Sequence, residues 1–341
     1  MTSRRRAQRP RGLRTAALLL VLAGCGDELQ TDPETAAAPA PGPAPIATAA
    51  NAPADPLQEI AHYELAPSQT LDVIEVRDER GELSLRRGVL RDKDGMVNHG
   101  AFQRWHENGQ MAEDGHYLAG ARHGRYIVIA DSGLKETEIE YRRGVKHGES
   151  LTWGKLGVLR ERAQYVDGVL DGPFEARTGE TNVRGRYAKG LEVGPWTWSD
   201  LDGHTLREGE FVAGKRTGTW RTWHANGQLA SEESLVDNVF DGPVVEYDEA
   251  GVRRAERNYK AGQLHGESLE YHADGRLAAR ITYSEGVPHG PQSRWYENGV
   301  LQMEGSMDRG KRSGPWIYNK LEGTRNEAWS GTYEADVRIG D

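Results

Sequence analysis

The feature that most constrains this chain is a pattern of glycines that repeats every 24 residues. If the first glycine of each unit is position 0, the only irregular step is one of 22 residues, from Gly172 to Gly194. Other glycines fill position 9 and position 20 in nearly every unit. A period of this length is typical of repeat proteins, in which each unit is one supersecondary structure. The position-0 glycines are Gly100, Gly124, Gly148, Gly172, Gly194, Gly218, Gly242, Gly266, Gly290 and Gly314.

The repeat decides how the 341 residues are organised. Stacked units contact mainly their neighbours, so we expect one long body and not two or three separate domains. Glycine is abundant at 42 residues, but only 15 prolines and no Gly-X-Y period exclude collagen. We assign the repeats to residues 99–323, a degenerate first repeat that acts as a cap to 57–98, and a closing segment to 324–341.

Each unit has the signals of a β-hairpin. Asn108-Gly109 is a dipeptide that tolerates positive φ at both centres of a type I′ turn, which predicts a two-residue loop at positions 8 and 9. This loop places position 0 opposite position 17, where most units carry tyrosine, so we expect the ring to cover the glycine. The glycines expected to be structural in this way are Gly100, Gly124, Gly148, Gly218, Gly242, Gly266, Gly290 and Gly314.

Strand pleating sorts the side chains of a hairpin onto two faces. With a two-residue loop, the aromatic residues at position 2, the aliphatic residues at position 11 and the tyrosines at position 17 share one face and form the apolar spine. The aromatic residues at position 5 belong to the opposite face, and a longer loop would change this sorting. The predicted fold is all-β: an elongated, twisted, single antiparallel sheet of stacked β-hairpins.

Residues 1–24 have the features of a signal peptide, because six arginines precede an apolar segment too short to span a bilayer. Leu22-Ala23-Gly24-Cys25 resembles a bacterial lipobox, and Cys25 is the only cysteine. The resemblance implies lipidation of Cys25 and a lipid anchor in the cell envelope, with Gly26 favouring the outer membrane. The alternative is an ordinary secretory signal. Residues 25–56, which are rich in Ala and Pro, are expected to form a disordered linker.

The charge balance limits the partners. The formal net charge is −9, and residues 1–24 carry six arginines and no acid, so the remaining chain has a charge near −15. Such a surface repels phosphate backbones and anionic lipid head groups. We therefore expect no nucleic-acid partner, and the charge argues against phospholipid recognition.

The motif His/Asp-Gly-x-aromatic-x-x-Trp/Tyr-x-x-Asn-Gly-x-Leu, followed by Tyr-x-x-Gly-x-x-x-Gly, resembles the bacterial variant of the MORN repeat. The resemblance covers residues 99–323. It implies successive hairpins joined into one sheet, and the family includes proteins labelled YwqK-type antitoxins. It therefore implies binding to a protein, in the sharpest version a toxin.

A column of histidines before position 0 is the strongest candidate for chemistry. Equivalent side chains in successive hairpins should lie two strands apart, about 9–10 Å, which is too far for the ligands of one zinc ion. Asp171 and Asp241 replace histidine in this column, which favours a polar turn residue. No catalytic motif is present, so we predict no metal, no cofactor and no enzymatic activity. The histidines are His99, His123, His147, His265 and His289.

The aromatic residues are the remaining candidates for binding. For any one of them, packing between neighbouring hairpins is the simpler interpretation. Trp196 and Trp198 differ, because both should lie on one face beside the 22-residue unit, and aromatic residues crowded at such a defect could form an interface. The candidate binding residues are Trp196, Trp198, Trp220, Trp223, Trp105 and Trp295.

We therefore predict a non-enzymatic, membrane-anchored repeat scaffold that binds another protein, or a second copy of itself, through its long face. The alternative is an envelope glycan-binding lipoprotein, in which Trp and Tyr stack on sugar rings.

Overall fold

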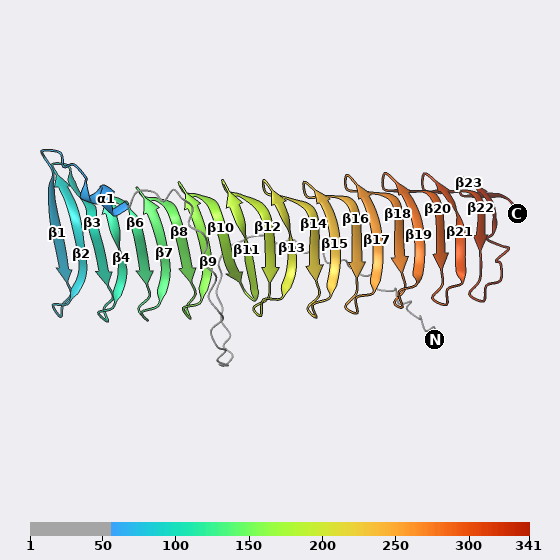
Figure 1. The fold of residues 1–341 in the computed structure, drawn as a ribbon, viewed down its shortest axis with the longest axis horizontal. Helices are drawn as coiled ribbons and strands as arrows, with labels where there is room; N and C mark the ends of the chain where they lie inside the picture. Colours follow the sequence, from blue (N-terminus) through green and yellow to red (C-terminus); the bar gives the residue numbers. More distant parts are fainter. Residues whose placement is uncertain (1–55) are drawn as a thin grey trace, which may run out of the picture. The chain divides into compact units, whose positions relative to one another are not determined.

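The computed structural model describes residues 56–341, which form one open antiparallel sheet (Figure 1). Strands that are consecutive in the sequence pair with each other from β1 at one end to β24 at the other, except that the short β5 and the following β6 both pair with β4. The predicted all-β fold is therefore confirmed. The predictions for residues 1–24, and for the linker as far as residue 55, lie outside the described residues.

One short helix and 24 strands make up this part of the chain. They are α1 (Pro56–Ala61), β1 (Thr70–Arg77), β2 (Leu83–Asp92), β3 (Gly95–Trp105), β4 (Met111–Leu118), β5 (Ala121–Arg122), β6 (Gly124–Ile129), β7 (Lys135–Arg142), β8 (Val145–Trp153), β9 (Leu159–Val166), β10 (Val169–Thr178), β11 (Thr181–Ala188), β12 (Leu191–Ser199), β13 (Thr205–Val212), β14 (Lys215–Trp223), β15 (Leu229–Val236), β16 (Val239–Tyr247), β17 (Arg253–Lys260), β18 (Gln263–Tyr271), β19 (Leu277–Ser284), β20 (Val287–Trp295), β21 (Leu301–Asp308), β22 (Lys311–Tyr318), β23 (Gly331–Glu334) and β24 (Val337–Gly340).

The hairpin within each full-length unit is closed by a three-residue loop, so the predicted two-residue type I′ turn at positions 8 and 9 is wrong. The N–H of His106 donates to the carbonyl of Gln110 (2.8 Å), and the N–H of Gly109 donates to the carbonyl of His106 (2.9 Å). Only Gly109 of the Asn-Gly pair has positive φ, at 81°. This is a type I turn that ends in a glycine of left-handed conformation, the usual three-residue hairpin loop.

Type I′ turns do occur, but at the opposite edge of the sheet, where one unit is joined to the next. Positions 19 and 20 both have positive φ there, as at Ala119 (46°) and Gly120 (90°). Asp237 (53°) and Asn238 (71°) adopt the same geometry without a glycine. The third glycine column therefore supplies the type I′ turns that we had predicted for the second column.

The 22-residue unit has a different turn. Thr178 pairs directly with Thr181 across Gly179-Glu180, and only Gly179 has positive φ, at 60°. A two-residue loop with positive φ at its first central position is of type II′. The pairing of β10 with β11 also lacks the bulge seen in the other hairpins. One loop residue and one bulge residue account for the shorter repeat.

The loop length changes the assignment of residues to faces. Gly100 pairs with Tyr117 and Phe102 with Gly115, so the predicted register of position 0 with position 17 is confirmed. Near the turn, Trp105 pairs with Met111, because the register shifts by one residue between Arg104 and Trp105. Position 11 therefore shares the face of position 5, and its assignment to the spine is wrong.

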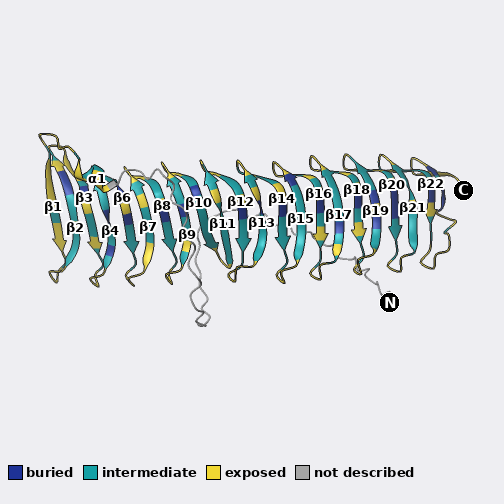
Figure 2. Cartoon of the chain, viewed as in Figure 1, coloured by how far each residue is buried: buried dark blue, intermediate teal, exposed yellow. Residues whose placement is uncertain are grey.

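The spine is the column at position 2. Four of its rings pack on a glycine at position 15 of the preceding hairpin, or at the equivalent place in the 22-residue unit: Tyr126 on Gly115, Trp196 on Gly185, Trp220 on Gly209 and Trp316 on Gly305. A Cβ atom at Gly209 would overlap the ring of Trp220, and one at Gly305 would overlap the ring of Trp316. These two tryptophans are each 1% exposed. By contrast, a Cβ atom at Gly100 would meet nothing within 4 Å, so the tyrosine does not cover position 0 as expected. Figure 2 shows the buried residues in the middle of the strands.

The position-0 glycines have another role, because all of them have positive φ. Gly148, with φ of 107°, lies in a bulge where the register between β7 and β8 shifts. A side chain is strained in this conformation, so glycine is the favoured residue there.

The sheet begins and ends outside the regular repeats. Its first hairpin, β1–β2, still has the same turn as the repeats, with the N–H of Asp78 donating to the carbonyl of Glu82 (2.8 Å). The sequence did not reveal α1, which precedes this hairpin. At the other end, β23 and β24 complete the sheet, and Tyr333 is 7% exposed there.

The ring-on-glycine packing makes a prediction for Gly209→Ala. The added methyl group has to displace the Trp220 ring, and overpacking of this kind costs about 1–3 kcal/mol. Urea unfolding should show this loss in the free energy of unfolding. Gly340→Ala is the matched control, because a Cβ atom at Gly340 meets nothing and its φ is not positive. Equal stability of the two variants would contradict the packing described here.

Candidate binding surface

The face that carries positions 0, 2, 4, 13, 15 and 17, here called the aromatic face, has its densest ring cluster beside the 22-residue unit. The ring of Trp198 lies 6.0 Å from that of Trp196 and 5.8 Å from that of Trp220. Phe174 lies 5.9 Å from Trp196, and Phe211 lies 5.1 Å from Trp220. The predicted placement of Trp196 and Trp198 on one face is therefore confirmed.

Two arginines cover this cluster. The guanidinium of Arg207 lies 4.7 Å from the ring centre of Trp220 and 5.8 Å from that of Trp198, and Arg216 lies 5.5 Å from Trp220. Cation–π contacts of this kind are attractive, and more so when they are desolvated. Burial lowers the pKa of Arg207, and the nearby charge of Arg216 lowers it further. No ion pair joins either arginine to a carboxylate within residues 56–341.

Not all the candidate tryptophans are available to a partner. Trp196 is 4% exposed and Trp220 is 1% exposed, so both are core residues of the spine. Trp198 is half-buried. The other three candidates, also half-buried, lie on the opposite face at position 5 and come from hairpins far apart in the sequence: Trp223, Trp105 and Trp295. The structure thus brings Trp198 together with two arginines that the sequence did not single out.

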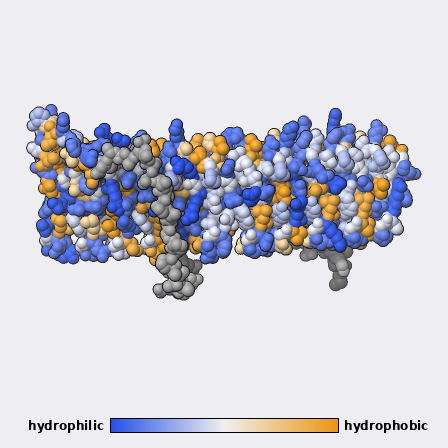
Figure 3. Space-filling view, viewed as in Figure 1, coloured by the Kyte–Doolittle hydropathy of each residue, from blue (hydrophilic) through white to orange (hydrophobic). Residues whose placement is uncertain are grey.

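The opposite face is charged in its centre. Positions 1, 3, 14 and 16 carry acids and bases that pair across strands, and we call this the charged face. Arg221 contacts both Glu208 (3.6 Å) and Glu232 (2.8 Å) from neighbouring strands. The space-filling view shows hydrophilic and apolar residues alternating along the sheet (Figure 3). Exposed pairs of this type contribute little to stability, about 0–1 kcal/mol each.

The side chains of the histidine column accept hydrogen bonds from the backbone of the type I′ turns. The Nδ1 atom of His99 accepts a hydrogen bond from the N–H of Ala119 (3.2 Å), and His123 accepts one from Arg143 (3.1 Å). Asp241 does the same for Ala261 with a carboxylate oxygen (3.3 Å). Histidine and aspartate are therefore interchangeable in this column because both can accept. This explains the column without a metal ion.

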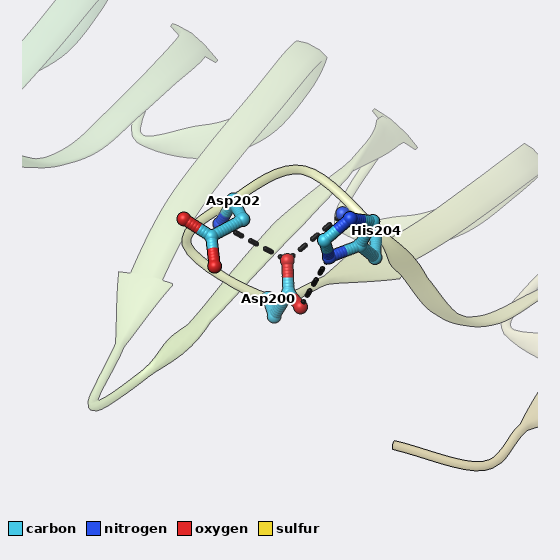
Figure 4. A group of neighbouring side chains, drawn as sticks. All are labelled: Asp200, Asp202 and His204. Carbon is cyan, nitrogen blue, oxygen red and sulfur yellow. Dashed lines mark hydrogen bonds and ion pairs between the residues drawn. The ribbon is translucent and has the colours of Figure 1, made fainter. Parts of the chain in front are cut away.

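One cluster of possible metal ligands lies in the turn between β12 and β13 (Figure 4). Asp200, Asp202 and His204 have ligand atoms within 4.8 Å of one another. The Oδ1 atom of Asp200 accepts from the N–H groups of Asp202 and His204. The side-chain hydrogen bond between Asp200 and His204 lowers the pKa of the aspartate and raises that of the histidine. Asp248 makes the same backbone bonds in its own turn, so the arrangement is explained by turn formation.

The described residues contain no helix long and apolar enough to cross a membrane. Cys25, the predicted lipidation site, lies outside the described residues, so the lipid anchor stays a prediction.

The fold defines a class of protein: a repeat scaffold in which hairpins of one recurring sequence pattern follow one another in a single open antiparallel sheet. The family described as MORN repeat variant matches residues 98–119, 216–237, 264–285 and 288–308. Together with the 24-residue hairpins, these matches support a MORN-repeat protein. No curated protein matches the chain.

Two solved structures align with the chain at low TM-scores. TcdB2-TccC3 is 11% identical, with a TM-score of 0.18; the alignment covers 80% of this chain and 17% of that one. A porin-like protein from Bacteroides uniformis is 10% identical, with a TM-score of 0.15. The alignment covers 76% of this chain and 92% of the porin-like protein. The chain thus spans less than a fifth of the length of TcdB2-TccC3, and neither alignment bears on the fold or function of this chain.

The hydrogen bond of His99 predicts a pH effect. Burial lowers the pKa of His99 below its ordinary value of 6.5, and the neutral ring accepts the Ala119 N–H. As the pH falls below that value, the unfolded chain takes up a proton that the folded His99 resists, so the stabilisation present at neutral pH is lost. Hydrogen exchange should show the protection factor of the Ala119 amide falling between pH 7.5 and pH 5.

His99→Asn is the control for this prediction, because asparagine retains an acceptor and does not titrate. Its Ala119 protection should change little over the same range. A wild-type protection factor that is constant with pH would contradict the assignment.

Proposed function

We propose that this protein is a non-enzymatic, membrane-anchored repeat scaffold that binds another protein through the aromatic face of its sheet. The observation that carries the proposal is the group of Trp198, Arg207 and Arg216 on that face. Trp and Arg are the residues most enriched among those that dominate binding energy at interfaces. Here they lie on buried rings, which hold them in place before a partner arrives.

Two further features support a protein partner. The two arginines stack on indole rings and leave their charge to a partner carboxylate, and charge-assisted hydrogen bonds to carboxylates are strong. The charged face, in contrast, already pairs its arginines with neighbouring glutamates, as Arg221 does. An acidic, partly aromatic partner surface would complement the cluster.

The resemblance to YwqK-type antitoxins suggests the sharper form of this proposal, in which the partner is a toxin whose active surface the sheet covers. The expected envelope location is an unusual place for that role. The identity of the partner therefore has to come from experiment, and neighbouring genes that encode a toxin would favour it.

Trp198→Ala tests the proposal. Full-length protein is purified from solubilised envelope, and the protein that accompanies it in stoichiometric amount is identified and its affinity measured. Removing a central interface tryptophan costs about 2 kcal/mol or more, so the affinity should fall by more than about tenfold. The free energy of unfolding is measured in parallel to separate binding from folding.

Trp329→Ala is the matched control, because Trp329 is 62% exposed and belongs to the closing segment, away from the cluster. It should leave the affinity unchanged. Unchanged binding by Trp198→Ala at unchanged stability would overturn the role of the cluster. Retention of the wild type on purified peptidoglycan, with no stoichiometric protein, would favour glycan binding instead.

A further inference from the structure

The edge of the sheet with the type I′ turns carries a row of exposed apolar side chains. They flank the turns at positions 18 and 21, and they are 42–59% exposed. We call this the turn row: Val145, Val166, Val169, Leu191 and Val212. Val166 and Val169 face each other directly across one turn. Single exposed apolar residues need no explanation, but a contiguous set points to an interaction site.

The row is continuous from hairpin to hairpin. Position 21 of one unit lies against the turn glycine of the next. A Cβ atom at Gly190 would lie 3.2 Å from Val169, and one at Gly214 would lie 3.4 Å from Leu191. The glycines that the type I′ turns favour therefore also leave room for these side chains to touch the following turn.

The chain covers the beginning of this same row with its own N-terminal segment. Leu118 and Ala121, the first residues at positions 18 and 21, line a cavity of about 670 Å³ together with Glu59 and Tyr63. Leu118 is 8% exposed, whereas its counterpart Val166 is 42% exposed. In Figure 1, α1 lies at the edge of the sheet that carries the type I′ turns. The first hairpin thus shows what kind of segment this edge accepts.

The bound segment is acidic as well as apolar. Glu59 of α1 contacts Arg143 (3.4 Å), Arg142 (3.7 Å) and His123 (3.7 Å). Tyr63 packs on His99 with 4.7 Å between ring centres. A carboxylate on a short helix therefore pairs with the bases beside the turn, while neighbouring side chains pack on the sheet.

Basic residues lie in three of the turns of the row. Arg142 and Arg143 contact Glu59 of α1. Lys215 pairs with Asp237 of the next turn (2.8 Å), and Lys189 is in no ion pair within the described residues. Asp167 is the acid in these turns. The chain as a whole has more acids than bases, 52 against 43. The pairing of Glu59 with Arg142 and Arg143, and the presence of Lys189 in the second turn after them, favour an acidic partner at this edge.

We propose that the turn row binds an amphipathic, acidic helical segment of a partner protein, in the way that the first hairpins bind α1. The partner segment presents apolar side chains to Val169 and Leu191 and a carboxylate to Lys189. This site goes beyond the proposed function, because it uses the edge of the sheet and none of the residues of the aromatic cluster. The turn row thus continues the surface that binds α1 along the same edge of the sheet.

A peptide with the sequence of residues 56–65, carrying a photoreactive group in place of Ile60, tests this site on the full-length protein. Cross-links are located by mass spectrometry. We expect them in the turns of residues 166–170 and 188–192. A double substitution, Val169→Lys with Leu191→Lys, should reduce the cross-linked product by about tenfold or more. Replacing the glutamate of the peptide by glutamine should reduce it as well.

The matched control is Leu156→Lys with Leu201→Lys, because these residues are 88% and 46% exposed at the opposite edge of the sheet. This variant should cross-link like the wild type, and urea unfolding should show that both variants are folded. Cross-links confined to β2–β4 and the turn of residues 142–146, where the peptide would only replace α1, would overturn the proposal. So would a yield no higher than that of a scrambled peptide. The Trp198→Ala variant should bind the peptide normally, so failure of one site is distinguishable from failure of the other.

Discussion

The core of this sheet depends on contacts between position 2 of one hairpin and position 15 of the hairpin before it. They are closest where a ring lies on a glycine, at Tyr126, Trp196, Trp220 and Trp316. A single-layer sheet has no second layer against which to bury apolar side chains, so it has to make its core within one face. Glycine allows this, because a ring can lie flat on its backbone where any Cβ atom would stand. Trp220 on Gly209 and Trp316 on Gly305 are as buried as core residues of a globular domain. Where position 15 is Ala163, the position-2 residue of the next hairpin is Phe174, a smaller ring.

The two edges of the sheet are fixed by hydrogen bonds that skip from one strand to another. At the edge with the type I′ turns, the side chain of the histidine or aspartate before position 0 accepts a hydrogen bond from the backbone N–H of the turn residue at position 19. At the other edge, the side-chain amide of Asn108 donates to the carbonyl of Asp131 in the next turn (2.7 Å), and Asn226 does the same with Glu249. His106 also reaches the next hairpin, through a hydrogen bond to the carbonyl of Ile129 (2.7 Å). Polar residues that look like turn formers thus also connect neighbouring units.

The sequence predicted the fold class, the register of position 0 with position 17 and the position-2 column of the spine, because the glycine and aromatic columns are in phase over the whole repeat. It assigned position 11 to the wrong face. It did not predict the turns correctly. Asn108-Gly109 suits a type I′ turn, but its asparagine is selected by hydrogen bonds to Gln110 and to the next hairpin. Ala119-Gly120 gives almost no local signal, and only the long-range pairing of Gly100 with Tyr117 fixes a type I′ turn there.

The candidate site was predictable only in part for the same reason. Trp196 and Trp198 stand out in the sequence, but Arg207 joins them through strand pairing, with no local motif to reveal it. The role of α1 was equally hidden, since a six-residue helix has too few residues to show a period. Its position depends on Glu59, which contacts bases more than 60 residues away in the sequence.

The type II′ turn of the 22-residue unit also bears on how the chain loses its structure. Hairpins here exchange contacts only with adjacent hairpins, so melting is expected to advance along the ladder one rung after another. The hairpin closed by Gly179 lacks the bulge found in the neighbouring hairpins, and the densest cluster of aromatic rings lies beside it. We therefore expect the stretch between Phe174 and Trp220 to be the last to come apart, with fraying at both ends of the sheet while its middle stays closed.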